Sequence, residues 1–174
     1  ITPELERAQV LAAIASLIII LIGFLFKQFD PLAGEKAALK GENKFLFDKN
    51  IPDNVIEELA WGSEAILTST AAASILIHND GVNILRRGII SNNEFIPGET
   101  CLKSINDMKL ISLANTKFYP GRDEFFNFCP DIPSILVVPI NSKAFILIGG
   151  WSAKCFTKSD EKWINNWSKK INNI

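Results

Sequence analysis

The sequence predicts an α+β domain that follows an N-terminal transmembrane helix. An uncharged run of 19 residues between Arg7 and Lys27 is long and apolar enough to span a bilayer. Short apolar runs of strand length, separated by turn-forming residues, follow in the second half of the chain. Amphipathic helix patterns lie before, between and after these runs. Because strands joined by tight turns pair antiparallel, we expect one antiparallel sheet of five or six strands packed by helices.

The apolar run is interpreted as a transmembrane helix over residues 1–30, with its span at about residues 8–26. As a helix the span would be about 28 Å long at about 1.5 Å per residue, close to the hydrocarbon core of about 30 Å. A cleaved signal peptide fits less well, because Glu4 and Glu6 precede the run and it is longer than the usual apolar core of such peptides. A buried soluble helix would show a polar face, which this run lacks.

The charges beside the span predict its orientation. The N-terminal flank carries one basic residue, Arg7, whereas the C-terminal flank carries Lys27, Lys36, Lys40 and Lys44. Because basic flanks stay on the cytoplasmic side of a membrane, we expect the globular part to lie there. The three cysteines, an odd number without C-x-x-C spacing, also fit a reducing compartment.

Residues 53–174 are expected to form the globular domain, and the mixed, polar residues 31–52 a juxtamembrane linker. The domain begins with a helix for which Asp53 is placed as the N-cap. Asn79-Asp80-Gly81 separates two apolar runs and is typical of a hairpin turn, which needs positive φ. The following elements are a helix over 101–108, a strand over 110–114, a loop over 115–133 with one helical turn, and strands over 134–140 and 144–151.

The chain closes with a helix that has a clear start signal. Thr157 and Asp160 have the spacing of a capping box. Its apolar residues share one face and are expected to pack on the domain; they are Trp163, Ile164, Trp167 and Ile171. Before it, Gly149-Gly150 is expected to mark a bulge or a tight packing point, because no phosphate-loop pattern surrounds it.

Composition and motifs exclude several functions. With 18 basic and 19 acidic residues, the net charge of -1 does not support nucleic-acid binding through a basic field. The single histidine, His78, is expected to be a partly exposed hairpin residue. The sequence lacks Ser/His/Asp, H-E-x-x-H, Walker and G-x-G-x-x-G patterns. We therefore predict no catalytic residue and no metal site.

Two groups of residues are candidates for partner binding. Arg86 and Arg87 are neighbours in a strand, so their side chains point to opposite faces of the sheet. Either one of them faces a partner or a pocket, or both protect an edge strand by their charge. The loop residues Lys117, Tyr119 and Arg122 combine cations and an aromatic ring around a turn, a composition suited to a recognition surface.

The thiols allow two further interpretations. Cys129, which precedes Pro130, is a candidate cofactor-binding residue because a thiolate can ligate haem iron; the alternative is an ordinary loop thiol. A thiol-dependent ligase using Cys101, Cys129 or Cys155 is a further alternative. Replacing all three by Ser should then abolish the function, and we expect that it would not.

Several strings carry a resemblance to known families. SILVVPI, AFILIGG and CFTKSDEKWINNWSKKI, together with the order of elements, resemble a GAF-like domain. A narrower resemblance covers nearly the whole chain and includes the apolar span. Its strings are ELAWGSEAILTSTAAASILI (58–77), LRRGII (85–90), FIPGETC (95–101) and KFYPGRDEF (117–125). They are similar to the family of proteins for cofactor assembly of complex C, the cytochrome b6f complex.

This resemblance implies a scaffold or chaperone that assists covalent attachment of a c-type haem to cytochrome b6 during cytochrome b6f biogenesis. The implied place is the thylakoid membrane, with the domain on its cytoplasmic or stromal side. The implied partners are apo-cytochrome b6, a paralogous or identical assembly factor and the membrane, with at most transient contact with haem. Members are also similar in having an apolar segment upstream, so the sequence is expected to be part of a longer chain. The alternative is a sensory GAF domain that binds a small ligand or tetrapyrrole in an enclosed pocket.

Overall fold

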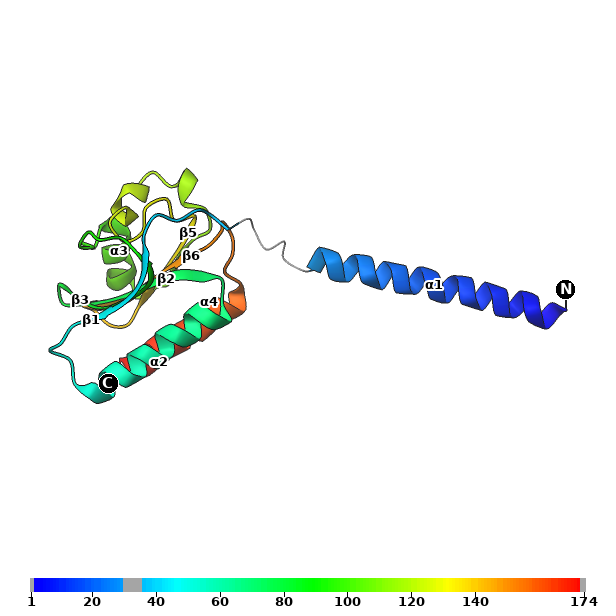
Figure 1. Cartoon of the computed structure of the whole chain (residues 1–174), viewed down its shortest axis with the longest axis horizontal. Coiled ribbons are helices and arrows are strands. Elements are labelled where there is room, and N and C mark those ends of the chain that lie inside the picture. The colour runs from blue at the N-terminus through cyan, green and yellow to red at the C-terminus, as the bar shows by residue number, and fades with distance from the viewer. Residues whose placement is uncertain (1, 30–35, 173–174) are drawn as a thin grey trace. The chain divides into compact units, whose positions relative to one another are not determined.

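The structure is a computed structural model that describes residues 2–29 and 36–172. The chain divides into two compact units, one up to residue 33 and one from residue 34 onward. The first unit is the helix α1 (Pro3–Phe29). The second unit contains a six-stranded sheet with helices on both of its faces (Figure 1).

Helix α1 meets the length and composition of a membrane span. Its stretch Pro3–Leu25 has a mean hydropathy of 2.6 and none of its most apolar window is buried against other parts of the chain. Glu4 and Glu6 lie in the first turn, where their charges complement the helix dipole. The Ser16 hydroxyl donates to the carbonyl of Ala12 at 2.8 Å, which satisfies the one hydroxyl in the apolar stretch. The helix is therefore a candidate span, as predicted.

The sheet of the second unit is antiparallel throughout, with the strand order β1-β3-β2-β6-β5-β4. Its strands are β1 (Glu42–Phe47), β2 (Ala72–Asn79), β3 (Val82–Ile90), β4 (Ile111–Leu113), β5 (Ser134–Pro139) and β6 (Ala144–Gly150). The predicted hairpin between β2 and β3 is present, and its turn residues Asp80 and Gly81 have φ of 47° and 85°. The α+β fold with an antiparallel sheet is thereby confirmed.

Helices cover both faces of the sheet (Figure 1). On one face α2 (Asp53–Ser69) and α4 (Lys158–Ile171) lie side by side. On the other face lie α3 (Glu99–Asp107) and two short 3-10 helices, η1 (Thr116–Phe118) and η2 (Arg122–Phe125), within the long loop. The predicted capping box of α4 is present, with the Thr157 hydroxyl and the Asp160 carboxylate bonding each other's backbone N–H.

The two covered faces explain why the central strands are apolar without interruption. Successive side chains of a strand point to opposite faces. In β6, Ile146 packs into the core under α2 and α4, whereas Leu147 packs into the core under the loop. The first core also contains Ile66 and Trp167, and the second is filled by three phenylalanines, Phe95, Phe125 and Phe128.

The structure corrects part of the predicted linker over residues 31–52. Residues 42–47 form β1, which makes six consecutive pairs with β3, and the Ala37 N–H donates to the carbonyl of Trp151 at 2.8 Å. Residues 31–35 lie outside the described residues. The strand was missed because it lies at the edge of the sheet. Its side chains are largely exposed, so they do not alternate between apolar and polar.

Three predictions about single residues also need correction. The N-cap of α2 is Pro52, and Asp53 is the first helical residue, where it complements the helix dipole without capping it. His78 is buried, because its ring lies against the ring of Phe145 at a centroid distance of 5.1 Å in the middle of the sheet. Trp163 is 38% exposed and lies at the margin of the buried face of α4.

Candidate functional site

The four strings that carry the narrower resemblance meet in two contacts on opposite faces of the sheet. The strings 58–77 and 85–90 meet where Arg87 of β3 reaches α2; this is called the arginine contact. The strings 95–101 and 117–125 meet where Glu124 of the loop reaches the start of α3; this is called the glutamate contact. Each contact therefore joins two segments that are distant in sequence.

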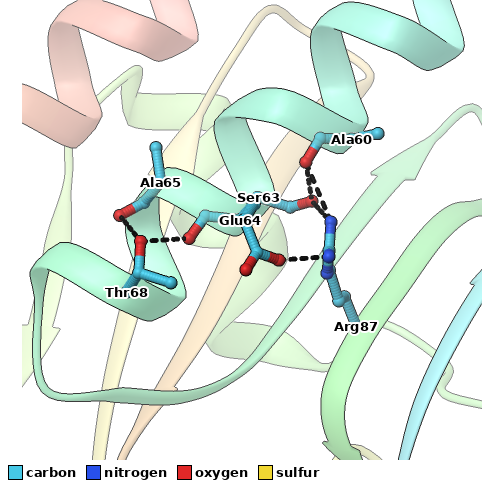
Figure 2. Close-up of polar contacts among 6 residues, drawn as sticks. All are labelled: Ala60, Ser63, Glu64, Ala65, Thr68 and Arg87. Atoms are coloured by element: carbon cyan, nitrogen blue, oxygen red, sulfur yellow. Dashed lines mark hydrogen bonds and ion pairs between the residues drawn. The ribbon is translucent and has the colours of Figure 1, made fainter.

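Figure 2 shows how the arginine contact is built. Ala60, Ser63 and Glu64 are spaced by three and four residues, which places them on one face of α2 towards β3. Arg87 Nη1 donates to the Ala60 carbonyl at 2.9 Å and to Ser63 Oγ at 3.4 Å, and Nη2 forms an ion pair with Glu64 Oε2. The guanidinium group thereby ties the second half of α2 to the sheet.

A shallow groove of about 480 Å³ lies beside the arginine contact. Its lining residues come from β1, α2 and β3; they are Asn43, Lys44, Phe45, Glu64, Leu67 and Arg87. The Arg87 guanidinium lies 4.7 Å from the ring centroid of Phe45, a cation–π distance. The Arg87 side chain is 23% exposed and that of Glu64 is 52% exposed, so part of this ion pair faces solvent.

Arg86 points to the opposite face from Arg87, as expected for neighbours in a strand. Its guanidinium donates to the carbonyls of Ser91 and Asn93, both at 2.9 Å, and holds the turn after β3. Burial lowers the pKa of Arg86, and the charge of Glu94 acts in the opposite direction. Both predicted arginines therefore bind backbone groups of their own chain.

The glutamate contact satisfies the N-terminus of α3. Glu124 Oε2 accepts hydrogen bonds from the Thr100 N–H at 3.1 Å and from its hydroxyl at 3.0 Å. The Tyr119 hydroxyl lies 2.7 Å from the same Thr100 oxygen. A Cβ at Gly98 would come within 2.7 Å of the Glu124 side chain, so a glycine is needed before the helix. Tyr119, a predicted partner residue, thus points into the protein.

Lys117 and Arg122, the other two predicted loop residues, line an open hollow of about 530 Å³ on the outside of the loop. Asp123 and Asp131 also line it, so the hollow has a rim of mixed charge. Beneath it, the space between the loop and the sheet is filled by apolar side chains, including Phe125, a fully buried ring. The hollow is suited to polar surface contacts.

The three thiols differ in their surroundings. Cys129 has no exposed surface, and burial together with the charge of Asp131 raises its pKa to about 11. Burial and the charge of Glu124 raise the pKa of Cys101 as well. Cys155 is partly buried, with its Sγ 3.1 Å from Ser134 Oγ. Cys101 and Cys129 are therefore protonated near neutral pH, which is unfavourable for a nucleophile or an iron ligand.

Within residues 2–29 and 36–172, no group of three His, Cys, Asp or Glu side chains is arranged to hold a metal ion. Sequence reasoning missed Glu64, Glu124 and Phe45 as parts of the two contacts. Glu64 and Glu124 lie inside the strings 58–77 and 117–125, which was the available signal. Their partners could not be read from the sequence, because Glu124 and Thr100 are 24 residues apart.

Sequence comparison places these features in a known family. The chain matches the family of proteins for cofactor assembly of complex C, CCB2/CCB4, over residues 1–171. Two similar proteins come from Arabidopsis thaliana, both chloroplastic. The cofactor assembly of complex C protein CCB4 is 23% identical over 95% of this chain, and CCB2 is 22% identical over 76%. The alignments cover 60% and 54% of these relatives' own lengths.

Structural comparison identifies the fold of the second unit as a GAF domain. A GAF domain region of a putative membrane protein from Geobacter sulfurreducens has a TM-score of 0.55 at 11% identity, over 69% of this chain and 94% of its own. A type II free methionine-R-sulfoxide reductase from Thermoplasma acidophilum has a TM-score of 0.58 at 13% identity, over 70% and 92%. The cyanobacteriochrome TePixJ GAF domain has 0.52 at 9% identity, over 71% and 89%. At these identities the likeness concerns the fold alone.

Proposed function

Because the chain belongs to the CCB2/CCB4 family of cofactor assembly of complex C, we propose that it is an assembly factor of the cytochrome b6f complex. It assists covalent attachment of a c-type haem to cytochrome b6 and acts as a scaffold or chaperone. The observation that carries the proposal is the family match over residues 1–171, which includes both the apolar helix and the GAF domain. The chain spans little more than half the length of its curated relatives, and the proposal concerns this part of such a protein.

The structure supports a scaffold more than an enzyme. The residues that carry the family strings are used to join α2 to the sheet and to cap α3. Two of the three thiols are buried and have raised pKa values. The space under the loop is filled by phenylalanine rings, so the geometry does not favour the sensory alternative, which needs an enclosed pocket there. A factor of this kind would act by presenting its surface to apo-cytochrome b6.

The proposed location is the thylakoid membrane, with α1 as the anchor and the GAF domain on the cytoplasmic or stromal side. Support comes from the apolar length of α1 and from the excess of lysines after it. Lys44 belongs to β1 and counts less as a flank residue than Lys36 and Lys40. Protease treatment of sealed thylakoid vesicles of known orientation tests this. Digestion of the GAF domain only from the luminal side would contradict the proposal.

Deletion of the gene tests the proposed function. Membrane proteins are separated under denaturing conditions and stained for haem, so that only covalently bound haem remains. We expect cytochrome b6 to lose its covalent haem while other covalent haem proteins of the same membranes keep theirs. Reintroduction of the gene should restore the signal. Normal covalent haem on cytochrome b6 in the deletion strain would overturn the proposal.

A further inference from the structure

The two edges of the sheet are unequal. At one edge β4 has three residues, a length that offers little backbone for pairing. At the other edge β1 has six residues and pairs with β3 without a register shift (Figure 1). In the part of the chain that the structure describes, no strand pairs with the outer side of β1. The sheet therefore ends in one long, regular edge.

Backbone groups on the outer side of β1 are available for pairing. The Asp48 N–H donates to the carbonyl of Ile84 at 2.9 Å, so residue 48 directs its backbone groups towards β3. Since this direction alternates along an antiparallel strand, Asn43, Phe45 and Phe47 direct their N–H and C=O groups away from β3. An added strand would meet these three residues.

The same strand exposes an apolar surface. Phe45, Leu46 and Phe47 are 39%, 48% and 45% exposed. The rings of Phe45 and Phe47 lie 5.6 Å apart, on the face that carries Arg87, because Phe45 is the cross-strand neighbour of Arg87. Phe45 also lines the groove beside the arginine contact. An exposed regular edge with apolar side chains is the usual template for strand addition.

We propose that a second copy of this chain pairs with β1, antiparallel across a two-fold axis at Leu46. In this register Phe45 lies opposite Phe47 of the second copy, and Lys44 lies opposite Asp48 of the second copy. Both pairs occur twice, so the strand is complementary to itself. A register centred on Lys44 would place two lysines opposite each other, and one centred on Phe45 would place Glu42 opposite Asp48. Charge thus selects the register at Leu46.

This pairing deepens the proposed function, on which it rests for its biological role, by naming the partner and the surface of a paired assembly factor. The four phenylalanines would gather between the two α2 helices and cover the groove at each arginine contact. Because the surface is confined to one strand and its groove, the soluble interaction is expected to be weak. Confinement of two copies in one membrane would raise their effective concentration.

Disulfide cross-linking of Leu46→Cys in the full chain, in dodecyl maltoside micelles and in phosphatidylcholine vesicles, tests the register. Residue 46 forms a non-hydrogen-bonded pair with itself, with Cα atoms at about 4.5 Å, which a disulfide can bridge. We expect covalent dimers to form at least tenfold faster than with Leu102→Cys, an equally exposed site on α3. The unsubstituted chain controls for the native thiols.

A charge exchange in the Leu46→Cys background makes the test specific. Lys44→Asp places like charges opposite each other twice and should slow cross-linking several-fold. Adding Asp48→Lys should restore the rate, and thermal unfolding of each variant shows that it is folded. Cross-linking no faster than at Leu102→Cys, or cross-linking in membranes only to a different protein, would overturn the proposal. Either result would leave the haem-attachment assay of the deletion strain unaffected.

Discussion

The arginine contact and the glutamate contact each use one charged side chain to join two family strings, but they do different work. Glu124 accepts hydrogen bonds at the start of α3, where the backbone N–H groups have no partner within the helix. Arg87 donates to the Ala60 carbonyl in the middle of α2, which already accepts a hydrogen bond within the helix. The first contact supplies a missing partner, whereas the second adds to groups that are already satisfied.

This difference indicates which contact is needed for folding and which is available for function. A helix end that loses its acceptor leaves partly buried N–H groups unpaired, which is costly. A half-exposed ion pair contributes little because solvent screens it. Arg87 nevertheless lies against Phe45 and borders the open groove. We infer that the glutamate contact is mainly structural, whereas the arginine contact also shapes a surface.

The largest expected effect breaks the α2 side of the comparison while leaving the glutamate contact intact. Gly62 precedes Ser63, and a Cβ there would lie about 2.1 Å from the Trp167 ring of α4. Gly62→Val should therefore separate α2 from α4 and lower the free energy of unfolding by about 3 kcal/mol or more. Urea unfolding of the detergent-solubilised chain, followed by tryptophan fluorescence, measures this.

Glu57→Val is the matched control for Gly62→Val. Glu57 is exposed on the same helix, so this variant carries the helix propensity of valine without the clash. We expect it to lower the free energy of unfolding by less than about 1 kcal/mol. Equal losses in the two variants would show that close packing at Gly62 does not hold α2 in place.

The second prediction concerns the glutamate contact directly. Glu124→Ala removes the acceptor from the Thr100 N–H and hydroxyl, and should cost about 2 kcal/mol of unfolding free energy. Asp123→Ala is the control, because Asp123 is 95% exposed and its distance to Arg122 is 3.8 Å. A loss in Glu124→Ala no larger than that of the control would contradict the structural role of this contact.

Third, Arg87→Lys should cost about 1 kcal/mol, less than Glu124→Ala. Lysine keeps the charge opposite Glu64 but lacks the planar fork that also reaches the Ala60 carbonyl. Arg87→Ala should cost more than Arg87→Lys, since its loss also uncovers Phe45. The comparison between the two contacts would be reversed if Arg87→Lys were more destabilising than Glu124→Ala in the same urea titration.

How far the sequence could predict these regions depends on the range of the interactions. Local signals were sufficient for the hairpin at Asp80-Gly81 and for the capping box at Thr157, because both are set by residues a few positions apart. Unbroken apolar runs predicted the buried strands β5 and β6. The strings around Ser63 and Tyr119 indicated the family before any geometry was known.

Long-range packing decided the rest. His78 is buried because β2 lies between β3 and β6, an order that the sequence does not show. Residues 42–47 become a strand through pairing with β3, although their own pattern is ambiguous. The pairing of Glu124 with Thr100 and of Arg87 with Ala60 depends on where the chain returns after many residues. Sequence strings therefore identified the segments, and only the fold identified the contacts.

The smallest expected effect distinguishes the two faces by pH. Cys101 and Cys129 both lie in the core on the side of the glutamate contact, and Cys101 Sγ is 3.8 Å from Glu124 Oε1. In the folded chain the pKa of Cys129 is raised from 9.0 to about 11, and that of Cys101 is also raised. Between these values the unfolded chain ionises its thiols while the folded chain keeps them protonated. Stability is therefore fully present below pH 9 and is lost as the pH rises towards 11.

At pH 9.5 the contribution of Cys129 to this loss should be about 1 kcal/mol. Urea unfolding of the full chain at pH 7 and at pH 9.5 measures the loss, and Cys101→Ala/Cys129→Ala is compared with it. Lysine and tyrosine side chains titrate alike in both proteins, so the difference between the two pH dependences belongs to the thiols. Cys155→Ala should keep the original pH dependence, because Cys155 lies outside this core. An unchanged pH dependence in the double variant would mean that the core beneath the glutamate contact does not hold its thiols protonated.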